Sequence, residues 1–271
     1  MKQLFHIENG KPDNTPQILS LRLGEKHAGF AITDKTGNNC YQLAYCSSDH
    51  DSWDENELTG FFAAYPVLDK PFYEVLVAYD HPAGMIIPSA GLKQEETGHL
   101  VNVTGNPVDH PVTITETIPG WQLYNVFSLP AVTRESVEKK FPAAKTWHQY
   151  SLGIRNISAG NINGSIQIDF RKDDFTVLVV RQSKFLLARA FDYSTPEDVI
   201  YYLLKTCRQF SLSQQEVILQ LSGLVDKDSA LYKELYQYFI HVEFRDASWH
   251  LDSEYPAHFF TSFNDLARCA S

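Results

Sequence analysis

The sequence predicts an α/β fold in which one arrangement of strands and a helix is written twice along the chain. Two hairpin patterns recur at a constant separation, and each is followed by a helix pattern and then a further strand pattern. The composition agrees with this, because 44% hydrophobic and 21% charged residues over 271 positions are typical of a folded globular protein.

The hairpins are identified by strict alternation of apolar and polar residues, which indicates strands with one buried face. Residues 19–24 and 28–33 alternate around a polar turn in the first half, and residues 166–171 and 175–180 do so in the second. Five apolar positions match at one offset of 147 residues, as Leu19 does with Ile166. A short polar turn between two such runs predicts a β-hairpin.

A third strand and a helix follow in each half. Alternating apolar residues predict the third strand over residues 41–45, matched by residues 185–187. Residues 194–198 supply an N-cap, a proline at the first helical position and acidic residues near the positive end of a helix. Apolar residues at three-to-four spacing continue this helix through Cys207, and a weaker version follows Asp54 in the first half.

A fourth strand is predicted after the helix, over residues 73–77 in the first half and 215–219 in the second. Because a helix precedes it, this strand is expected to pair in parallel, which makes a mixed sheet covered by helices. The polar Gly- and Asn-rich stretch at residues 156–164 is the predicted boundary. We therefore expect a first lobe over residues 1–160, with a strand-rich insertion, and a second over residues 161–271.

The halves diverge after the fourth strand. Strand patterns over residues 112–115 and 123–127 form the predicted insertion, and a short helix is predicted over residues 134–141. The second half instead continues with a predicted helix over residues 231–239.

Net charge excludes several partners. A formal charge of −10 opposes binding to nucleic acid or to anionic lipid. No apolar run approaches the ~20 residues of a membrane helix, and the first ten residues lack a secretory pattern, so a cytoplasmic protein is expected. The sequence contains no HExxH, GxSxG, GxGxxG or P-loop motif.

Two other features admit two interpretations each. The acid-rich segment from Asp49 to Glu55 could bind a divalent cation, but its place before a helix favours a solvated helix N-terminus. Tyrosines gather on two predicted helices of the second half, where they serve either packing against the sheet or a protein interface. The residues concerned are Tyr201, Tyr202, Tyr232, Tyr236 and Tyr238.

The element order strand, strand, strand, helix, strand, written twice, resembles the actin-like ATPase fold. Sugar kinases, heat-shock seventy chaperones and bacterial actin relatives in cell division and pilus assembly have that fold. The amino-acid sequence of residues 174–187, 194–204 and 219–223 resembles that of a protein family from Bacteroides-type organisms described as actin-like. The resemblance implies two ribonuclease H-like lobes, and it brings no established activity with it.

In active members of the fold the first hairpin of each half cradles phosphates with small turn residues, and an Asp ends its first strand. The resemblance places Arg22 at the Asp position of the first half, where Gly24 is retained. In the second half Asp169 is present, but Arg171 occupies the glycine position. Of the glycine pair expected beside adenosine, Gly223 remains. Bulky, charged turns predict a degenerate site without a catalytic residue, cofactor or metal ion.

The leading expectation is therefore a non-catalytic interaction or assembly component with a protein partner. The alternative is an ATPase or nucleotide-dependent switch in which ATP and magnesium bridge the lobes. In that alternative Asp169 would position the metal ion and a water molecule. A third possibility is that another small molecule binds in the same cleft. The residues that would contact the nucleotide are Gly24, Lys26, Arg171, Lys172, Ser222 and Gly223.

Overall fold

The chain forms two compact units, which we call unit 1 and unit 2. The computed structural model describes residues 1–10, 15–48, 53–91, 108–157 and 161–269. Unit 1 consists of residues 1–152, 248–253 and 263–271, and unit 2 of residues 153–247 and 254–262. Unit 1 thus takes its last two segments from the C-terminal end of the chain. The predicted lobe boundary at residue 160 falls outside the described residues, and that division stays a prediction.

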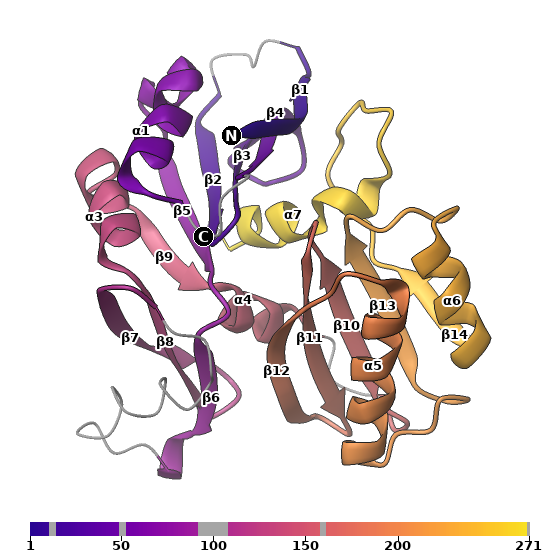
Figure 1. Cartoon of the computed structure of the whole chain (residues 1–271). Coiled ribbons are helices and arrows are strands. Elements are labelled where there is room, and N and C mark those ends of the chain that lie inside the picture. Colours follow the sequence, from indigo (N-terminus) through magenta and orange to yellow (C-terminus); the bar gives the residue numbers. More distant parts are fainter. Residues whose placement is uncertain (11–14, 49–52, 92–107, 158–160, 270–271) are drawn as a thin grey trace. The chain divides into compact units, whose positions relative to one another are not determined.

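Unit 1 is built on a six-stranded mixed sheet (Figure 1). The hairpin strands and their edge partners are antiparallel, whereas β2, β5 and β9 are parallel neighbours. The strand order is β1 (Lys2–Glu8), β4 (Cys40–Ser47), β3 (His27–Asp34), β2 (Gln17–Gly24), β5 (Glu74–Asp80) and β9 (Lys145–His148). The predicted parallel pairing of the fourth strand is confirmed, while β1 and β9 were not predicted.

Helices cover the sheet of unit 1. The helices α1 (Glu55–Ala64) and α3 (Ala131–Lys140) bury apolar residues against Leu19, Leu21 and Val77. The next residues along β2 and β5 point to the opposite face. There Ile18 and Leu76 pack against Leu152 of α4 (Gln149–Asn156) and Leu266 of α7 (Thr261–Ala267). The sheet therefore has an apolar core on both faces.

A three-stranded antiparallel sheet completes unit 1. Its order is β6 (Gly84–Pro88), β8 (Leu123–Pro130) and β7 (Pro111–Ile118). The strands predicted over residues 112–115 and 123–127 are confirmed within β7 and β8. Short 3-10 turns, η1 (Pro66–Asp69) and η2 (Ser89–Gly91), connect neighbouring elements.

Unit 2 has a five-stranded mixed sheet with α5 (Pro196–Phe210) and α6 (Ala230–Tyr238) in its hydrophobic core (Figure 1). As predicted, Pro196 is the first residue of α5, and a capping box between Thr195 and Asp198 precedes it. The strand order is β12 (Lys184–Asp192), β11 (Asp174–Arg181), β10 (Ser165–Phe170), β13 (Ile218–Gly223) and β14 (His241–Phe244), and a 3-10 turn η4 (Ala257–Phe260) follows.

Five strands in each unit have the same order and directions, β4-β3-β2-β5-β9 in unit 1 and β12-β11-β10-β13-β14 in unit 2. The pairing of β3 with β4 shifts register next to Ile32, and the pairing of β11 with β12 shifts register next to Val179. These two residues are among those matched by the sequence offset.

Two predicted strand positions are wrong in detail. The strand predicted over residues 215–219 begins at Ile218, because Glu216 and Val217 donate backbone hydrogen bonds to the carbonyl of Ser213 in a turn. The third strands were matched as Leu43 with Leu187, yet Leu43 pairs with Ala31 whereas Leu187 pairs with Val179. The match is therefore one residue out of register, which exchanges the two faces of a strand.

Candidate functional site

The tip of the first hairpin, which we call the unit 1 tip, holds a buried cluster of charged side chains. Parallel pairing of β2 with β5 sets Gly24 beside Asp80. One carboxylate oxygen of Asp80, Oδ2, lies 2.5 Å from Arg22 Nη2 and 3.0 Å from His27 Nε2. The side chain of Asp80 is fully buried, and those of Arg22 and His27 are 9% and 6% exposed. The unit 1 tip therefore contains its own ion pair.

The His27 ring covers the glycine of the unit 1 tip. A Cβ atom added to Gly24 would lie 2.2 Å from His27 Cε1, so the imidazole occupies the space beside the glycine backbone. The same ring stacks on Tyr45 at a centroid distance of 5.6 Å, and the Arg22 guanidinium lies 5.5 Å from the ring centre of Phe263. A phosphate approaching this backbone would have to displace the imidazole.

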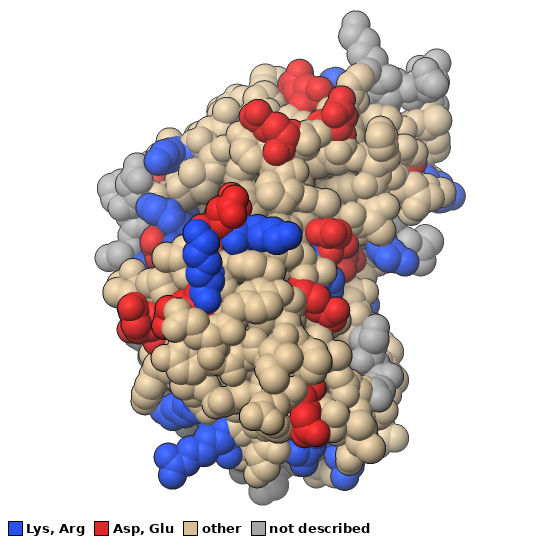
Figure 2. All heavy atoms as spheres, turned by 90° about the vertical axis from the view of Figure 1, so that its right-hand side faces the viewer, with Lys and Arg blue, Asp and Glu red and all other residues tan. Residues whose placement is uncertain are grey.

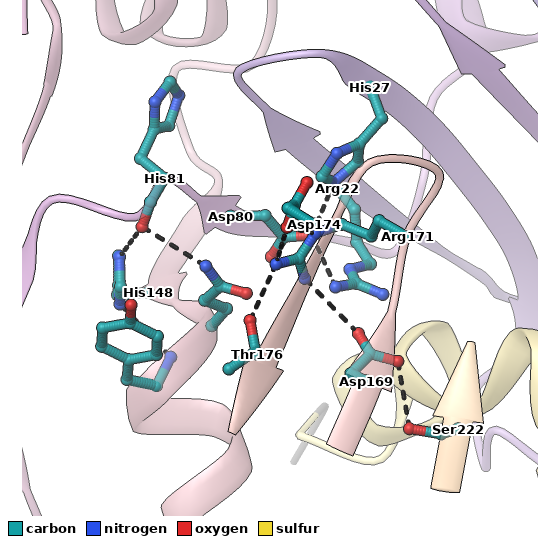
Figure 3. A network of polar contacts seen from close by, with 12 residues as sticks. Arg22, His27, Asp80, His81, His148, Asp169, Arg171, Asp174, Thr176 and Ser222 are labelled. Carbon is teal, nitrogen blue, oxygen red and sulfur yellow. Dashed lines mark hydrogen bonds and ion pairs between the residues drawn. The ribbon is translucent and has the colours of Figure 1, made fainter. Parts of the chain in front are cut away.

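The tip of the second hairpin, the unit 2 tip, is organised around Arg171 (Figure 3). Arg171 Nε donates to Asp174 Oδ1 at 2.5 Å and Arg171 Nη2 to Thr176 Oγ1 at 2.8 Å. Arg171 Nη1 lies 3.8 Å from Asp169 Oδ2, and the hydroxyl of Tyr193 donates to the Arg171 carbonyl at 3.0 Å. The Arg171 side chain is 5% exposed, so this tip too is filled from within.

Burial of Tyr193 beside this cluster changes the pKa of its hydroxyl. It raises the pKa of the Tyr193 hydroxyl to about 12, and the nearby carboxylates of Asp174 and Asp173 act in the same direction. The phenol therefore stays protonated and remains a donor to the Arg171 carbonyl over the whole physiological range.

Asp169, the predicted metal-placing residue, lies in β10 directly opposite Ser222 of β13. The Ser222 hydroxyl is 3.0 Å from Asp169 Oδ1 and 3.2 Å from the Ile168 carbonyl (Figure 3). Ser222 is 1% exposed. The structure brings Asp169, Arg171 and Ser222 together, and their predicted roles toward a nucleotide stay predictions.

Gly223 has a structural reason to be glycine. Its φ of +78° lies in the left-handed region, and an added Cβ would lie 2.1 Å from the Phe170 carbonyl oxygen. The Leu224 amide donates to that same carbonyl at 2.8 Å. Close approach of β13 to β10 thus requires glycine here, whether or not a base stacks nearby.

The two predicted phosphate lysines lie at the hairpin turns. Lys172 is half-exposed, and its ammonium is 3.9 Å from Asp173. Lys26 is partly buried next to His27 in the unit 1 tip. Both lysines belong to hairpin turns, and the predicted contact of both with phosphate stays a prediction.

The sequence interpretation missed Asp80 and His27. Their signal was present, because Asp80 follows the predicted fourth strand, and the carboxyl end of a parallel strand beside a hairpin is a common place for site residues. His27 lies next to the polar turn between the two strands, where local sequence gives it no special role. The pairing of Asp80 with Arg22 and with His27 cannot be read from local patterns, since Asp80 is 58 positions from Arg22 and 53 from His27 in the sequence.

A second buried polar group follows Asp80. The carbonyl of His81 accepts hydrogen bonds from His148 Nε2 at 2.8 Å and from the Gln149 side chain at 3.3 Å (Figure 3). Among the described residues, neither ring nitrogen of His81 has a hydrogen-bond partner. Burial lowers the pKa of His81 to about 3, and nearby His148 and His27 act in the same direction. The imidazole is therefore neutral in the folded protein.

Other predicted sites are only partly described. Residues 49–52 of the acid-rich segment lie outside the described residues. Asp54 is described, and its carboxylate accepts from the Glu57 amide at 2.7 Å as the N-cap of α1. Within the described part of the chain, no group of three His, Cys, Asp or Glu residues could hold a metal ion, and no helix is long and apolar enough to cross a membrane.

Solved structures share this architecture. A Bacteroides thetaiotaomicron protein, described as having an actin-like ATPase fold and unknown function, aligns at a TM-score of 0.80 with 19% identity over 96% of this chain and 100% of its own. The type IV pilus PilM–PilN complex gives 0.60 with 12% identity over 92% of this chain and 97% of its own. The ethanolamine utilization protein EutJ of Carboxydothermus hydrogenoformans gives 0.51 with 12% identity over 97% and 92%.

These likenesses show that the chain has an actin-like ATPase fold, and at such low identities they show the fold alone. No curated protein matches the sequence. A family described as "Protein of unknown function (DUF3822)" matches residues 8–242. With most of its length covered by that match and the predicted resemblance confirmed, the chain belongs to the DUF3822 family.

Proposed function

We propose that this protein is a non-catalytic member of the actin-like fold, with two duplicated ribonuclease H-like lobes, that serves as an interaction or assembly component. One observation carries the proposal. At both hairpin tips, where an active relative would present small residues to phosphate, an arginine is buried against carboxylates of its own unit.

The energetics of those arginines oppose a triphosphate. A phosphate that entered either tip would compete with Asp80 or Asp174 for the guanidinium and leave that carboxylate without its partner. Breaking a buried ion pair costs about 3–5 kcal/mol. Entry at the unit 1 tip would also require the His27 ring to leave Gly24.

The interaction half of the proposal is supported by the surface of unit 2. Tyr201 of α5 and Tyr236 and Tyr238 of α6 are 58%, 49% and 41% exposed. Figure 2 shows that the side of the molecule carrying these helices has broad uncharged areas between its charged groups. Exposed tyrosine suits protein interfaces because it combines apolar area with a polar end. Among the structures of similar fold is the PilM–PilN complex of type IV pilus biogenesis.

The nucleotide-dependent switch stays the competing proposal, and one observation favours it. Asp169 is the last residue but one of β10, its side chain is 18% exposed, and the Ser222 hydroxyl donates to it. A carboxylate so placed could hold a magnesium ion through water.

Thermal unfolding with and without ATP–Mg at about 1 mM separates the two proposals. A ligand at one hundred times its Kd stabilises a protein by about 2.7 kcal/mol, which raises Tm by several degrees. We expect no shift for the natural protein. A shift that Asp169→Ala abolishes would overturn our proposal in favour of the switch.

The interaction role needs its own measurement. We expect the protein isolated from its native host to carry a partner at constant stoichiometry, and we expect Asp169→Ala to carry it equally. Asp169→Ala is thus the control. The test variant is Tyr236→Ser with Tyr238→Ser, which should release the partner without altering Tm by more than a few degrees. An unaccompanied natural protein, or a complex that requires ATP, would contradict the proposed role.

A further inference from the structure

Unit 1 contains a cavity of about 430 Å³ that lies apart from its tip. Gln17, the first residue of β2, lines the cavity, whereas Gly24, the last residue of that strand, belongs to the tip. At about 3.3 Å per residue the two ends of β2 are about 23 Å apart. The cavity is therefore independent of any nucleotide site at the hairpin.

One wall of the cavity comes from β1, the strand that unit 1 has in addition to the shared five. His6 and Glu8 are two residues apart on β1, so both face the cavity side. The Gln42 amide nitrogen contacts both, at 3.3 Å from His6 Nε2 and 3.2 Å from Glu8 Oε1. The Gln42 contact orients the Glu8 carboxylate, which lines the cavity. In the described part of unit 2 no strand lies beyond β12, so that unit lacks a matching wall.

The strand irregularity in β4 supplies a second cavity residue. Ile32 pairs with Gln42 and Thr33 with Cys40, which leaves Tyr41 as an extra residue between them. A β-bulge redirects a side chain out of the regular alternation. Tyr41 lines the cavity, and among the described residues its hydroxyl has no hydrogen-bond partner.

The other lining residues include apolar groups and one cation. Ile32, Tyr65, Pro66 and Val67 line the cavity, and the Tyr65 hydroxyl is already bonded to Gln3 at 2.8 Å. Lys70 also lines the cavity, and within the described residues its ammonium makes no ion pair. The cavity lining thus combines a carboxylate, an ammonium and several apolar side chains.

We propose that this cavity binds a small zwitterion with an apolar body, of the chemical class of a short unmodified peptide. Glu8 receives the ligand's ammonium group, Lys70 receives its carboxylate, and the Tyr41 hydroxyl adds a hydrogen bond. The apolar side chains of the ligand lie against Ile32, Pro66 and Val67. The volume is within the range of small-molecule pockets, which suits two or three linked residues better than a single ion.

Calorimetric titration of the full chain with leucyl-leucine tests the proposal. Two blocked peptides report each end separately, N-acetyl-leucyl-leucine without the ammonium and leucyl-leucinamide without the carboxylate. We expect saturable binding of leucyl-leucine with a Kd near or below about 1 mM, and weaker binding of both blocked peptides.

Two variants assign the ends. Glu8→Gln should weaken the binding of leucyl-leucine about fivefold and leave the binding of the N-acetyl peptide unchanged. Lys70→Met should weaken the binding of leucyl-leucine to the same extent and leave the binding of leucyl-leucinamide unchanged. Both residues are exposed, so folding is expected to persist, and the controls are Glu216→Gln and Lys227→Met in unit 2. No saturable binding of leucyl-leucine, equal binding of the blocked peptides, or equal losses in the control variants would overturn the proposal. None of these outcomes bears on the hairpin tips.

Discussion

The two hairpin tips of this protein bury an arginine by different routes. In the unit 1 tip, Arg22 of β2 meets Asp80 at the end of β5, so the pair joins two strands far apart in the sequence. In the unit 2 tip, Arg171 meets Asp174 three positions away, within the hairpin itself. Asp80 is fully buried, whereas the Asp174 side chain is 24% exposed.

The difference teaches that the position of the arginine decides the kind of partner. Arg22 stands where the other unit has Asp169, within the strand, and its guanidinium reaches a neighbouring strand. Arg171 stands where unit 1 has Gly24, at the turn, and its guanidinium donates to Asp174 and Thr176 of the other strand of the same hairpin. The unit 1 tip therefore depends on tertiary pairing, and the unit 2 tip on local pairing.

The largest expected effect comes from removing the long-range pair. Arg22→Met should lower the free energy of unfolding by about 3–5 kcal/mol, because the fully buried Asp80 carboxylate loses its cation. The matched Arg171→Met should cost about 1–3 kcal/mol, because Asp174 keeps access to solvent. Urea unfolding of both variants measures the difference. Equal losses would show that the two tips are energetically alike.

The glycines of the two units should also differ. Gly223→Ala is expected to cost about 3 kcal/mol, because the residue has positive φ and the new Cβ meets the Phe170 backbone, which cannot rotate away. Gly24→Ala should cost about 1 kcal/mol, because its Cβ meets the side chain of His27. In the double variant Gly24→Ala with His27→Ala, the Gly24 cost should nearly vanish. A Gly24 cost unchanged by removal of the imidazole would contradict this account.

Acid should affect unit 1 through His81. The unfolded chain binds a proton on this imidazole below its ordinary pKa of 6.5, while the folded form does not until about pH 3. Stability is therefore lost as pH falls between those values, by about 2 kcal/mol from this residue at pH 5.

Unit 2 indicates which substitution to make at His81. The residue at the corresponding place of unit 2 is Val225, which is 1% exposed, so valine is a suitable buried replacement. His81→Val should remove about 2 kcal/mol of the acid sensitivity at pH 5 while changing stability much less at pH 8. Chemical unfolding at the two pH values measures it, and an unchanged pH dependence would assign the sensitivity to another group.

The smallest effect is expected at the exposed lysine of the unit 2 tip. Lys172→Ala should change the free energy of unfolding by no more than about 0.5 kcal/mol, because its contact with Asp173 is long and half-exposed. The same variant tests whether Lys172 binds phosphate, since it would then weaken any ATP–Mg stabilisation. A large loss of stability would mean that charged turn residues contribute more to this tip than their geometry indicates.

Much of the fold could be predicted from local patterns. Alternation identified both hairpins, and the cap and proline at residues 194–198 identified the start of α5, because these signals depend on neighbours in the sequence. The strand β1 was missed. Its alternation extends only from Phe5 to Glu8, because the register of its pairing with β4 shifts between Gln3 and Phe5.

The candidate site was predictable only in part. Gly24, Asp169 and Arg171 were identified because the order of elements resembles a known fold and places those positions at the turns. The partners Asp80 and His27, and the packing of Phe263 on Arg22, required strands and a C-terminal helix to come together. Side-chain contacts between such distant segments have no periodic trace in a sequence.

The amino-acid order by itself determined where strands and helices form and which turns are bulky and charged, since propensity, capping and alternation act over a few residues. Tertiary structure alone decided that Arg22 is neutralised by Asp80, that residues 263–269 complete unit 1, and that β1 adds a wall to a cavity. The physical reason is that ion pairing and burial act through space, so their outcome depends on which distant segments the folded chain brings into contact.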